Sequence, residues 1–202
     1  MLDSSIEILE EGQKSISSER KSLLDSIAKR LLTDSNLNAL NFICTHNSRR
    51  SQFAQIWAFV LSNHYQIRGL GYYSGGTMLT ACHPNVLKAL ESFGIDSEQK
   101  TQGENPHYLI QNEAKEANLE IFSKTYDHPS NLSSNFVAIM TCDHADENCP
   151  FIPGASARFS LHYQDPKRFD GTKSELVEYQ KTALQIGTEL HYLIKTLSIG
   201  KK

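Results

Sequence analysis

The segment most suggestive of chemistry is CTHNSRRS at residues 44–51, where an arginine follows a cysteine by six positions. A short apolar run at 40–44 precedes it, and apolar residues recur at helical spacing from Phe53 onward, which predicts a strand, a loop and a helix. Backbone N–H groups and the helix dipole favour an anion at a helix N-terminus. The N–H groups of residues 45–50 could therefore each donate to an oxygen of a tetrahedral oxyanion.

The side chains of this segment suit the same chemistry. Arg50 could add a bidentate, charge-assisted pair to the oxyanion. These positive surroundings would favour the thiolate of Cys44, which would then act as a nucleophile. The alternative is a buried, inert cysteine at a strand end. We predict catalytic roles for Cys44 and Arg50 and an oxyanion-binding loop made of Thr45, His46, Asn47, Ser48, Arg49, Arg50 and Ser51. Within it, Ser51 could donate its hydroxyl to the sulfur, and Asn47 could brace the turn.

A second candidate is Asp165, which precedes Pro166 in the segment LHYQDPKRFDG after the last predicted strand. Transfer of a group from its leaving oxygen to a thiolate requires a proton donor, and an aspartate on a loop can serve. An Asp-Pro pair alone indicates only a turn, so the catalytic prediction for Asp165 depends on Cys44 and Arg50.

Two further cysteines, Cys142 and Cys149, lie seven residues apart in TCDHADENCP, on what we predict to be one loop after a core strand. Three interpretations compete. A zinc site would use both thiolates and His144, but no second Cys/His pair lies nearby to complete a tetrahedron. The thiols could also be inert. In the third interpretation they form a redox pair, in which one thiol resolves a bond to Cys44 and the other regenerates it. We predict no metal and no cofactor.

Composition limits the classes of protein that remain. Twenty Lys+Arg against 23 Asp+Glu give a net charge of −3, so nothing suggests a nucleic-acid partner. No apolar run approaches the roughly 20 residues that span a bilayer, so no membrane partner is predicted. The acidic N-terminus lacks the basic and apolar regions of a signal peptide. We therefore expect a cytoplasmic protein whose thiols stay reduced.

The order of predicted elements indicates an α/β fold. Strands expected at 40–44, 67–76, 136–141 and 157–161 alternate with helices, which implies a parallel sheet with helices on both faces. Residues 107–111 and 119–123 flank a polar stretch, which predicts a β-hairpin inserted at about 105–124. We expect a helical N-terminal extension at 1–38 and a catalytic domain at 39–202. The apolar stripe of the extension favours a helix packed on the domain over an oligomer or partner interface; it consists of Leu23, Leu24, Ile27, Leu31 and Leu32.

These residues carry a resemblance to a known family. CTHNSRRSQFAQ is similar to the active-site loop of the low-molecular-weight protein tyrosine phosphatase superfamily, and especially to that of thioredoxin-coupled arsenate reductases. The match extends through SGG (74–76), HPNVLKALESFGID (83–96) and CDHADENCP with Asp165-Pro166, and covers about residues 40–197. The Cys142/Cys149 pair favours the reductase side. The resemblance implies a flavodoxin-like sheet of four parallel strands, with Cys44 at the carboxyl end of one strand.

The resemblance also implies a catalytic cycle. Cys44 attacks arsenate, which the loop amides and Arg50 hold, while Asp165 supplies or positions protons. Cys142 then attacks Cys44, which releases arsenite and leaves a disulfide between the two cysteines. Cys149 next attacks Cys142 and frees Cys44, and thioredoxin reduces the resulting Cys142–Cys149 disulfide. The partners expected are therefore an oxyanion substrate, either arsenate or a phosphate ester, and thioredoxin as the reductant.

Some positions depart from the family pattern. His46 stands where glycine is usual, and Arg49 adds a charge beside Arg50. Gln55 stands where reductases that bind a structural potassium ion place a glutamate, so no potassium site is predicted. Two alternatives remain open: a phosphatase that hydrolyses phosphotyrosine or small phosphate esters through a cysteinyl phosphate, and a metalloid or zinc sensor without turnover.

Overall fold

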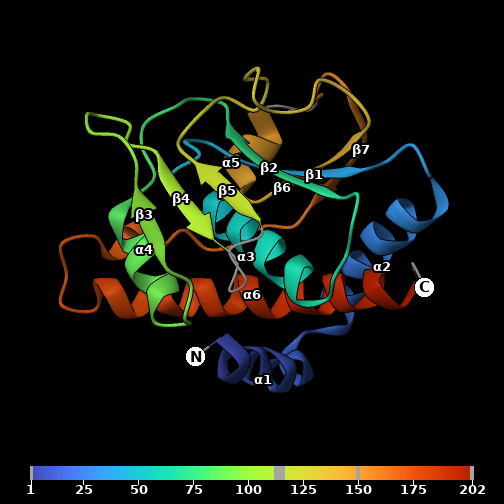
Figure 1. Cartoon of the computed structure of the whole chain (residues 1–202), viewed down its shortest axis with the longest axis horizontal. Coiled ribbons are helices and arrows are strands. Elements are labelled where there is room, and N and C mark those ends of the chain that lie inside the picture. The colour runs from blue at the N-terminus through green and yellow to red at the C-terminus, as the bar shows by residue number, and fades with distance from the viewer. Residues whose placement is uncertain (1, 112–116, 149–150, 201–202) are drawn as a thin grey trace.

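The central feature of the fold is a four-stranded parallel sheet (Figure 1). The computed structural model describes residues 2–111, 117–148 and 151–200. The sheet has the strand order β2-β1-β6-β7, and its strands are β1 (Ala39–Cys44), β2 (Gly71–Gly76), β6 (Phe136–Met140) and β7 (Ala155–Ser160). All three strand pairs are parallel. The predicted flavodoxin-like sheet is therefore confirmed, although β2 begins at Gly71 rather than at residue 67.

The order of the strands determines where a ligand can bind. The chain leaves β1 toward β2 on one side and later returns to place β6 on the other side. Open α/β sheets bind ligands at such a switch point, beyond the carboxyl ends of the strands. Cys44 is the last residue of β1, and Cys142 follows β6 by two residues. The two thiols therefore lie at the same edge of the sheet.

Helices cover both faces, as predicted, but unequally. On one face α3 (Arg50–His64) packs on β1 and β2, and α6 (Glu175–Gly200) packs over α3, with α4 (Pro84–Glu91) alongside (Figure 1). The α3 helix is buried almost all round, as its fully buried Phe53 and Trp57 show. The other face is covered by the short helix α5 (Asp143–Asn148) and by residues packed beside it, among them Leu132 and Ile152.

The N-terminal segment forms α1 (Leu2–Gly12), the 3-10 turn η1 (Gln13–Ser15) and α2 (Ser18–Thr33). Both helices pack on α6, and Figure 1 shows α1 on the outer side of that helix. Leu24, Ile27 and Leu31 are buried, whereas Leu32 is 37% exposed. The predicted stripe therefore packs on the domain. Leu24, Ile27 and Leu31 belong to the same hydrophobic cluster as residues of the sheet. The division of the chain into an extension and a catalytic domain at residue 38 therefore remains a proposal.

The predicted hairpin is present and is larger than expected. Strands β4 (Tyr108–Gln111) and β5 (Asn118–Ile121) pair antiparallel, and the residues between them at 112–116 lie outside the described ranges. A third strand, β3 (Ser97–Gln99), pairs with β4. The sequence did not predict β3 because its three residues are polar and exposed, and so show no apolar alternation.

One predicted loop is wrong. The residues after Cys142 form α5, whose first turn begins with a hydrogen bond from Asp146 N to Cys142 O at 3.1 Å. The stretch contains no glycine or proline, and its first-turn carboxylates, Asp143 and Asp146, favour a helix N-terminus. Within the described residues, none of the helices combines the length and apolar character that a membrane crossing requires.

Candidate active site

The loop between β1 and α3 surrounds the thiol of Cys44, which is 4% exposed. Its Sγ lies 3.1 Å from Ser51 Oγ, in the first turn of α3. Asn47 adopts a left-handed backbone conformation with φ of 46°, which asparagine tolerates better than most residues. Its side chain donates to Ser51 Oγ at 2.8 Å and accepts from Lys124 N at 2.9 Å. Asn47 therefore links the turn both to Ser51, which contacts the sulfur, and to the backbone at Lys124.

The hydrogen bonds of this loop leave its amides available. The carbonyls of residues 44–49 each accept at least one hydrogen bond; the donors are Thr77 N, Met78 N, Ser123 Oγ, Gln52 Nε2, His83 N and Phe53 N. Among the described contacts, the N–H groups of residues 45–49 donate none. Successive free N–H groups before a helix form an anion-binding concavity. This arrangement suits an oxyanion directly above Cys44.

Gly76 allows the loop to take this path. A Cβ atom at Gly76 would lie 2.8 Å from both Asn47 N and Thr45 O. Any side chain at this position would therefore push the loop away from β2. The SGG segment that the sequence singled out thus has a steric role beneath the loop.

Arg50 meets Asp165 at the mouth of the loop. Arg50 Nη2 donates to Asp165 Oδ2 at 2.6 Å, and Nη1 donates to the carbonyl of Tyr163 at 3.1 Å. The Nε atom is buried and has no hydrogen-bond partner in the described part of the chain. A cavity of about 10 Å³ is lined by Cys44, His46, Ser48, Arg49, Arg50 and Asp165. That is room for about one water molecule, so the site is narrow with the Arg50–Asp165 pair formed.

Arg49, in contrast, pairs with a different carboxylate. Its guanidinium binds Asp170 Oδ2 at 2.7 Å and the hydroxyl of Tyr179, which itself donates to Asp170 at 2.8 Å. Asp165 and Asp170 lie at the two ends of the 3-10 turn η2 (Pro166–Phe169). The two neighbouring arginines of the loop therefore hold both ends of this turn.

The second thiol, Cys142, lies beside the loop. It is 1% exposed, and its Sγ is 3.5 Å from Thr45 Oγ1, which is also 3.4 Å from His144 Nδ1. Cys149 lies outside the described residues. Cys82 is a buried thiol elsewhere, and burial raises its pKa to about 12, which makes it a suitable unreactive reference.

One group of three possible metal ligands occurs among the described residues, His83, Asp170 and Glu175. Its carboxylates already accept hydrogen bonds from Arg49 and Asn85 at 2.7 Å. A cation there would also face the charge of Arg49. We therefore assign this group a structural role.

Gln55 occupies a buried position between α3 and β2. Its Nε2 donates to Tyr72 O at 2.9 Å, and its Oε1 accepts from Ser74 Oγ at 2.5 Å. Both ends of the amide are therefore used in linking the helix to the strand.

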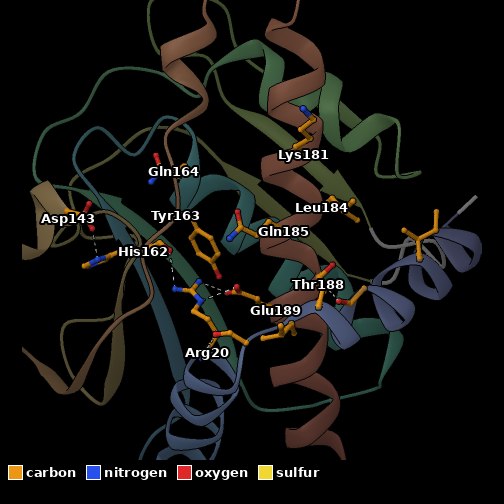
Figure 2. A pocket seen from close by; sticks show the side chains of 15 residues that line it. Arg20, Asp143, His162, Tyr163, Gln164, Lys181, Leu184, Gln185, Thr188 and Glu189 are labelled. Carbon is orange, nitrogen blue, oxygen red and sulfur yellow. Dashed lines mark hydrogen bonds and ion pairs between the residues drawn. The ribbon is translucent and has the colours of Figure 1, made fainter.

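A much larger cavity, of about 790 Å³, lies away from Cys44 (Figure 2). It is bounded by the N-terminal segment, by α6 and by residues 162–164, and Arg20, Tyr163 and Glu189 are among the residues that line it. It borders the active site, because the carbonyl of its lining residue Tyr163 binds Arg50.

Cys44 is expected to be the most reactive thiol of the protein. The N–H groups of residues 45–49 beside Cys44 are free to bind an anion, whereas burial raises the pKa of Cys82 and keeps that thiol protonated. Iodoacetamide near neutral pH should alkylate Cys44 first, and sulfate or phosphate should protect it. Peptide mapping after timed alkylation measures this. Labelling of Cys44 no faster than that of Cys82, without oxyanion protection, would contradict a nucleophilic role.

His46 is expected to make oxyanion binding stronger in acid. Burial, together with the positive charges of Lys167 and Arg49, lowers the pKa of His46 below its ordinary value, so the ring is neutral at pH 7. As the pH falls through this lowered pKa, the ring becomes a cation beside the anion. In a Cys44→Ser background, sulfate affinity should rise at least about threefold as the pH is lowered from 7 through this pKa, as an added nearby charge predicts. Adding His46→Gln should remove the rise; an unchanged rise would exclude His46 as its source.

Comparison with known proteins places the chain beside two groups of enzymes. It is 28% identical over 141 residues to an arsenate reductase of Halalkalibacterium halodurans, covering 69% of this chain and 82% of the relative. An arsenate reductase of Bacillus cereus is 27% identical over 161 residues, covering 80% of this chain and 97% of that protein. No family model matches the chain.

Solved structures also resemble the fold of this chain. A low-molecular-weight phosphotyrosine phosphatase from Vibrio cholerae superposes with a TM-score of 0.52 at 16% identity, covering 78% of this chain and 95% of that structure. In sequence the chain is thus similar to arsenate reductases, and in fold it is similar to a low-molecular-weight phosphatase; both of these groups are enzymes. The resemblance derived from the sequence is confirmed.

Proposed function

We propose that this chain is a thioredoxin-coupled arsenate reductase with Cys44 as nucleophile. The observation that carries the proposal is a second free, buried thiol, Cys142, packed against the oxyanion loop through Thr45 at 3.5 Å. Hydrolysis of a phosphate ester does not need such a thiol. Reduction of arsenate needs a second thiol to form a disulfide with Cys44. The similarity to arsenate reductases in sequence supports the same choice.

The first step forms a bond between sulfur and arsenic. The Cys44 thiolate attacks As(V) while the loop amides hold the other oxygens. The Nε atom of Arg50, buried and without a partner, is a donor placed to join them. Asp165, 2.6 Å from Arg50, protonates the departing oxygen, which leaves as water.

The second step is the reduction. The Cys142 thiolate attacks Cys44 Sγ, the sulfur–arsenic bond breaks, and its electron pair stays on arsenic. Two thiols are thereby oxidised to a disulfide, and As(V) becomes arsenite. Cys149 then attacks Cys142 and Cys44 leaves as a thiolate. A thioredoxin dithiol finally reduces the Cys142–Cys149 disulfide.

The position of α5 adds a conformational requirement to this cycle. Its six residues separate Cys142 from position 149 and span about 9 Å at about 1.5 Å per residue. A disulfide joins Cα atoms roughly 4.4–6.8 Å apart. We therefore propose that α5 unwinds when Cys142 and Cys149 pair, and that thioredoxin meets the protein at this helix.

The proposal is tested by measuring NADPH oxidation with thioredoxin and thioredoxin reductase, with and without arsenate, beside hydrolysis of p-nitrophenyl phosphate. Arsenate-dependent oxidation that vanishes in Cys44→Ser but persists in Cys82→Ala is expected. Hydrolysis of p-nitrophenyl phosphate without arsenate-dependent oxidation of NADPH would favour a phosphatase over the reductase. The same reducing system suits a cytoplasmic location, where thiols stay reduced.

The second candidate is a phosphatase that acts on phosphotyrosine or small phosphate esters. The observation in its favour is that Cys44, Arg50 and Asp165 line one cavity, and a cysteinyl-phosphate mechanism needs no further side chain. A sensor without turnover has less support, because a proton donor paired with the oxyanion-binding arginine serves turnover rather than binding.

Asp165→Asn is expected to slow chemistry more than binding under either function. The amide keeps the size of the side chain but cannot protonate the leaving oxygen, so kcat should fall about 10²-fold, the low end for a lost acid or base. Affinity, measured by sulfate protection of Cys44, should change little. Unchanged kcat would mean that Asp165 only forms the turn before Pro166.

A further inference from the structure

The segment that carries Asp165 is held by an arginine from the N-terminal extension. Arg20, in α2, donates from Nη1 to the carbonyl of His162 at 3.1 Å. This contact joins residues 142 positions apart in the sequence, and it connects the extension to a point three residues before Asp165. Figure 2 shows Arg20 beneath the loop that contains His162 and Tyr163.

Arg20 is itself fixed by α6. Its Nε and Nη2 atoms donate to the two carboxylate oxygens of Glu189, at 3.0 and 2.5 Å, and Glu189 is only 5% exposed. The guanidinium carbon lies 5.0 Å from the ring centroid of Tyr163. A planar guanidinium has its donors in a fixed fork, so two bonds to Glu189 determine where the third donor points. That donor points at the carbonyl of His162.

The two neighbouring carbonyls of this segment are bound by two different arginines. Arg20 binds the carbonyl of His162, and Arg50 of the active-site loop binds the carbonyl of Tyr163. The Arg50 contact lies within the catalytic site, and its guanidinium is shared with the oxyanion. The Arg20 contact lies outside that site and is free to persist.

We propose that Arg20 is a positioning residue for Asp165. By holding His162 against α6, it keeps the segment 162–165 docked while Arg50 binds the oxyanion. The N-terminal extension is then part of the catalytic scaffold. This inference rests on the proposed function in assigning Asp165 as the proton donor.

Three variants separate this role from a general effect on stability. Arg20→Lys keeps the charge that Glu189 needs but loses the fork that reaches His162. The double variant Arg20→Met/Glu189→Met removes both charges together, which avoids leaving a buried carboxylate unpaired. Arg30→Met is the matched control, because Arg30 lies on the same helix and its ion pair is with the nearby Asp34, at 3.0 Å.

Two readouts are needed, one of which does not depend on activity. Hydrogen exchange of peptides covering 162–169 should accelerate about tenfold in Arg20→Lys and in the double variant, the effect of one lost charge-assisted hydrogen bond. Exchange in α3 and in the sheet should stay unchanged. Turnover should show a kcat lowered about tenfold with sulfate protection of Cys44 unaltered, and Arg30→Met should match the wild type.

The outcomes distinguish the inference from the proposed function. Exchange at 162–169 that stays at the wild-type rate, or that rises equally throughout the chain, would overturn the role of Arg20. A wild-type protein that neither reduces arsenate nor hydrolyses p-nitrophenyl phosphate would contradict the proposed function. The exchange experiment would still decide whether Arg20 holds the segment.

Discussion

Cys142→Ser and Cys149→Ser are each expected to abolish thioredoxin-coupled turnover of arsenate. Without the Cys142 thiolate, no thiol attacks Cys44 to form the first disulfide. Without Cys149, the Cys44–Cys142 disulfide is not converted into the Cys142–Cys149 disulfide that thioredoxin reduces. The sulfur of Cys142 already contacts the oxyanion loop through Thr45 at 3.5 Å, so serine at this site replaces a reactive group with little change in packing. The steady-state rate of NADPH oxidation measures the effect.

The same variants provide their own control for folding. Hydrolysis of p-nitrophenyl phosphate, where the wild type shows it, should survive both substitutions because a cysteinyl phosphate is released by water. Cys82→Ala, which removes a buried thiol outside the cycle, should keep arsenate turnover. Full turnover in both serine variants would leave the phosphatase as the better account.

The second large effect is expected from Arg50→Lys. Arg50 uses separate nitrogens for Asp165 and for the carbonyl of Tyr163, and its Nε is left for the oxyanion. An ammonium group offers no such planar fork, so the charge is kept while the geometry is lost. We expect kcat/KM to fall about 10³-fold, as for lost oxyanion stabilisation, for arsenate and for phosphate esters alike.

Arg68→Lys serves as the matched control, because Arg68 is exposed and lies outside the site. It should match the wild type in both assays. If Arg50→Lys retains more than about a tenth of the wild-type kcat/KM, far above the loss expected for an oxyanion donor, then charge alone holds the oxyanion and the bidentate arrangement is unnecessary.

Much of the fold could be predicted because its signals are local. Short apolar runs marked β1 and β6, and the helical spacing after Phe53 marked α3, whereas β2 and β7 were predicted from weaker patterns. The elements that were missed or misjudged lack such signals. The strand β3 is polar and depends on pairing with β4, and α5 was taken for a loop because its six residues contain a single apolar one, Ala145, and so show no apolar periodicity.

The candidate site likewise contains parts that the sequence predicts and parts that it does not. Residues 44–51 could be recognised together because one loop and one helix N-terminus determine their arrangement. The contacts that hold the site from outside were not predictable. Arg20 and Arg50 bind backbone carbonyls, which carry no sequence signature, and Asp170 and Tyr179 reach Arg49 from more than 120 positions away.

The central claim is that oxidising equivalents pass from Cys44 to Cys142. Peptide mapping of the Cys149→Ser protein after treatment with arsenate, without reductant, tests it most directly. We expect a Cys44–Cys142 disulfide formed in proportion to the arsenite released, and none when phosphate replaces arsenate. Release of arsenite without this disulfide, or Cys142 left as a free thiol after exposure to arsenate, would contradict it.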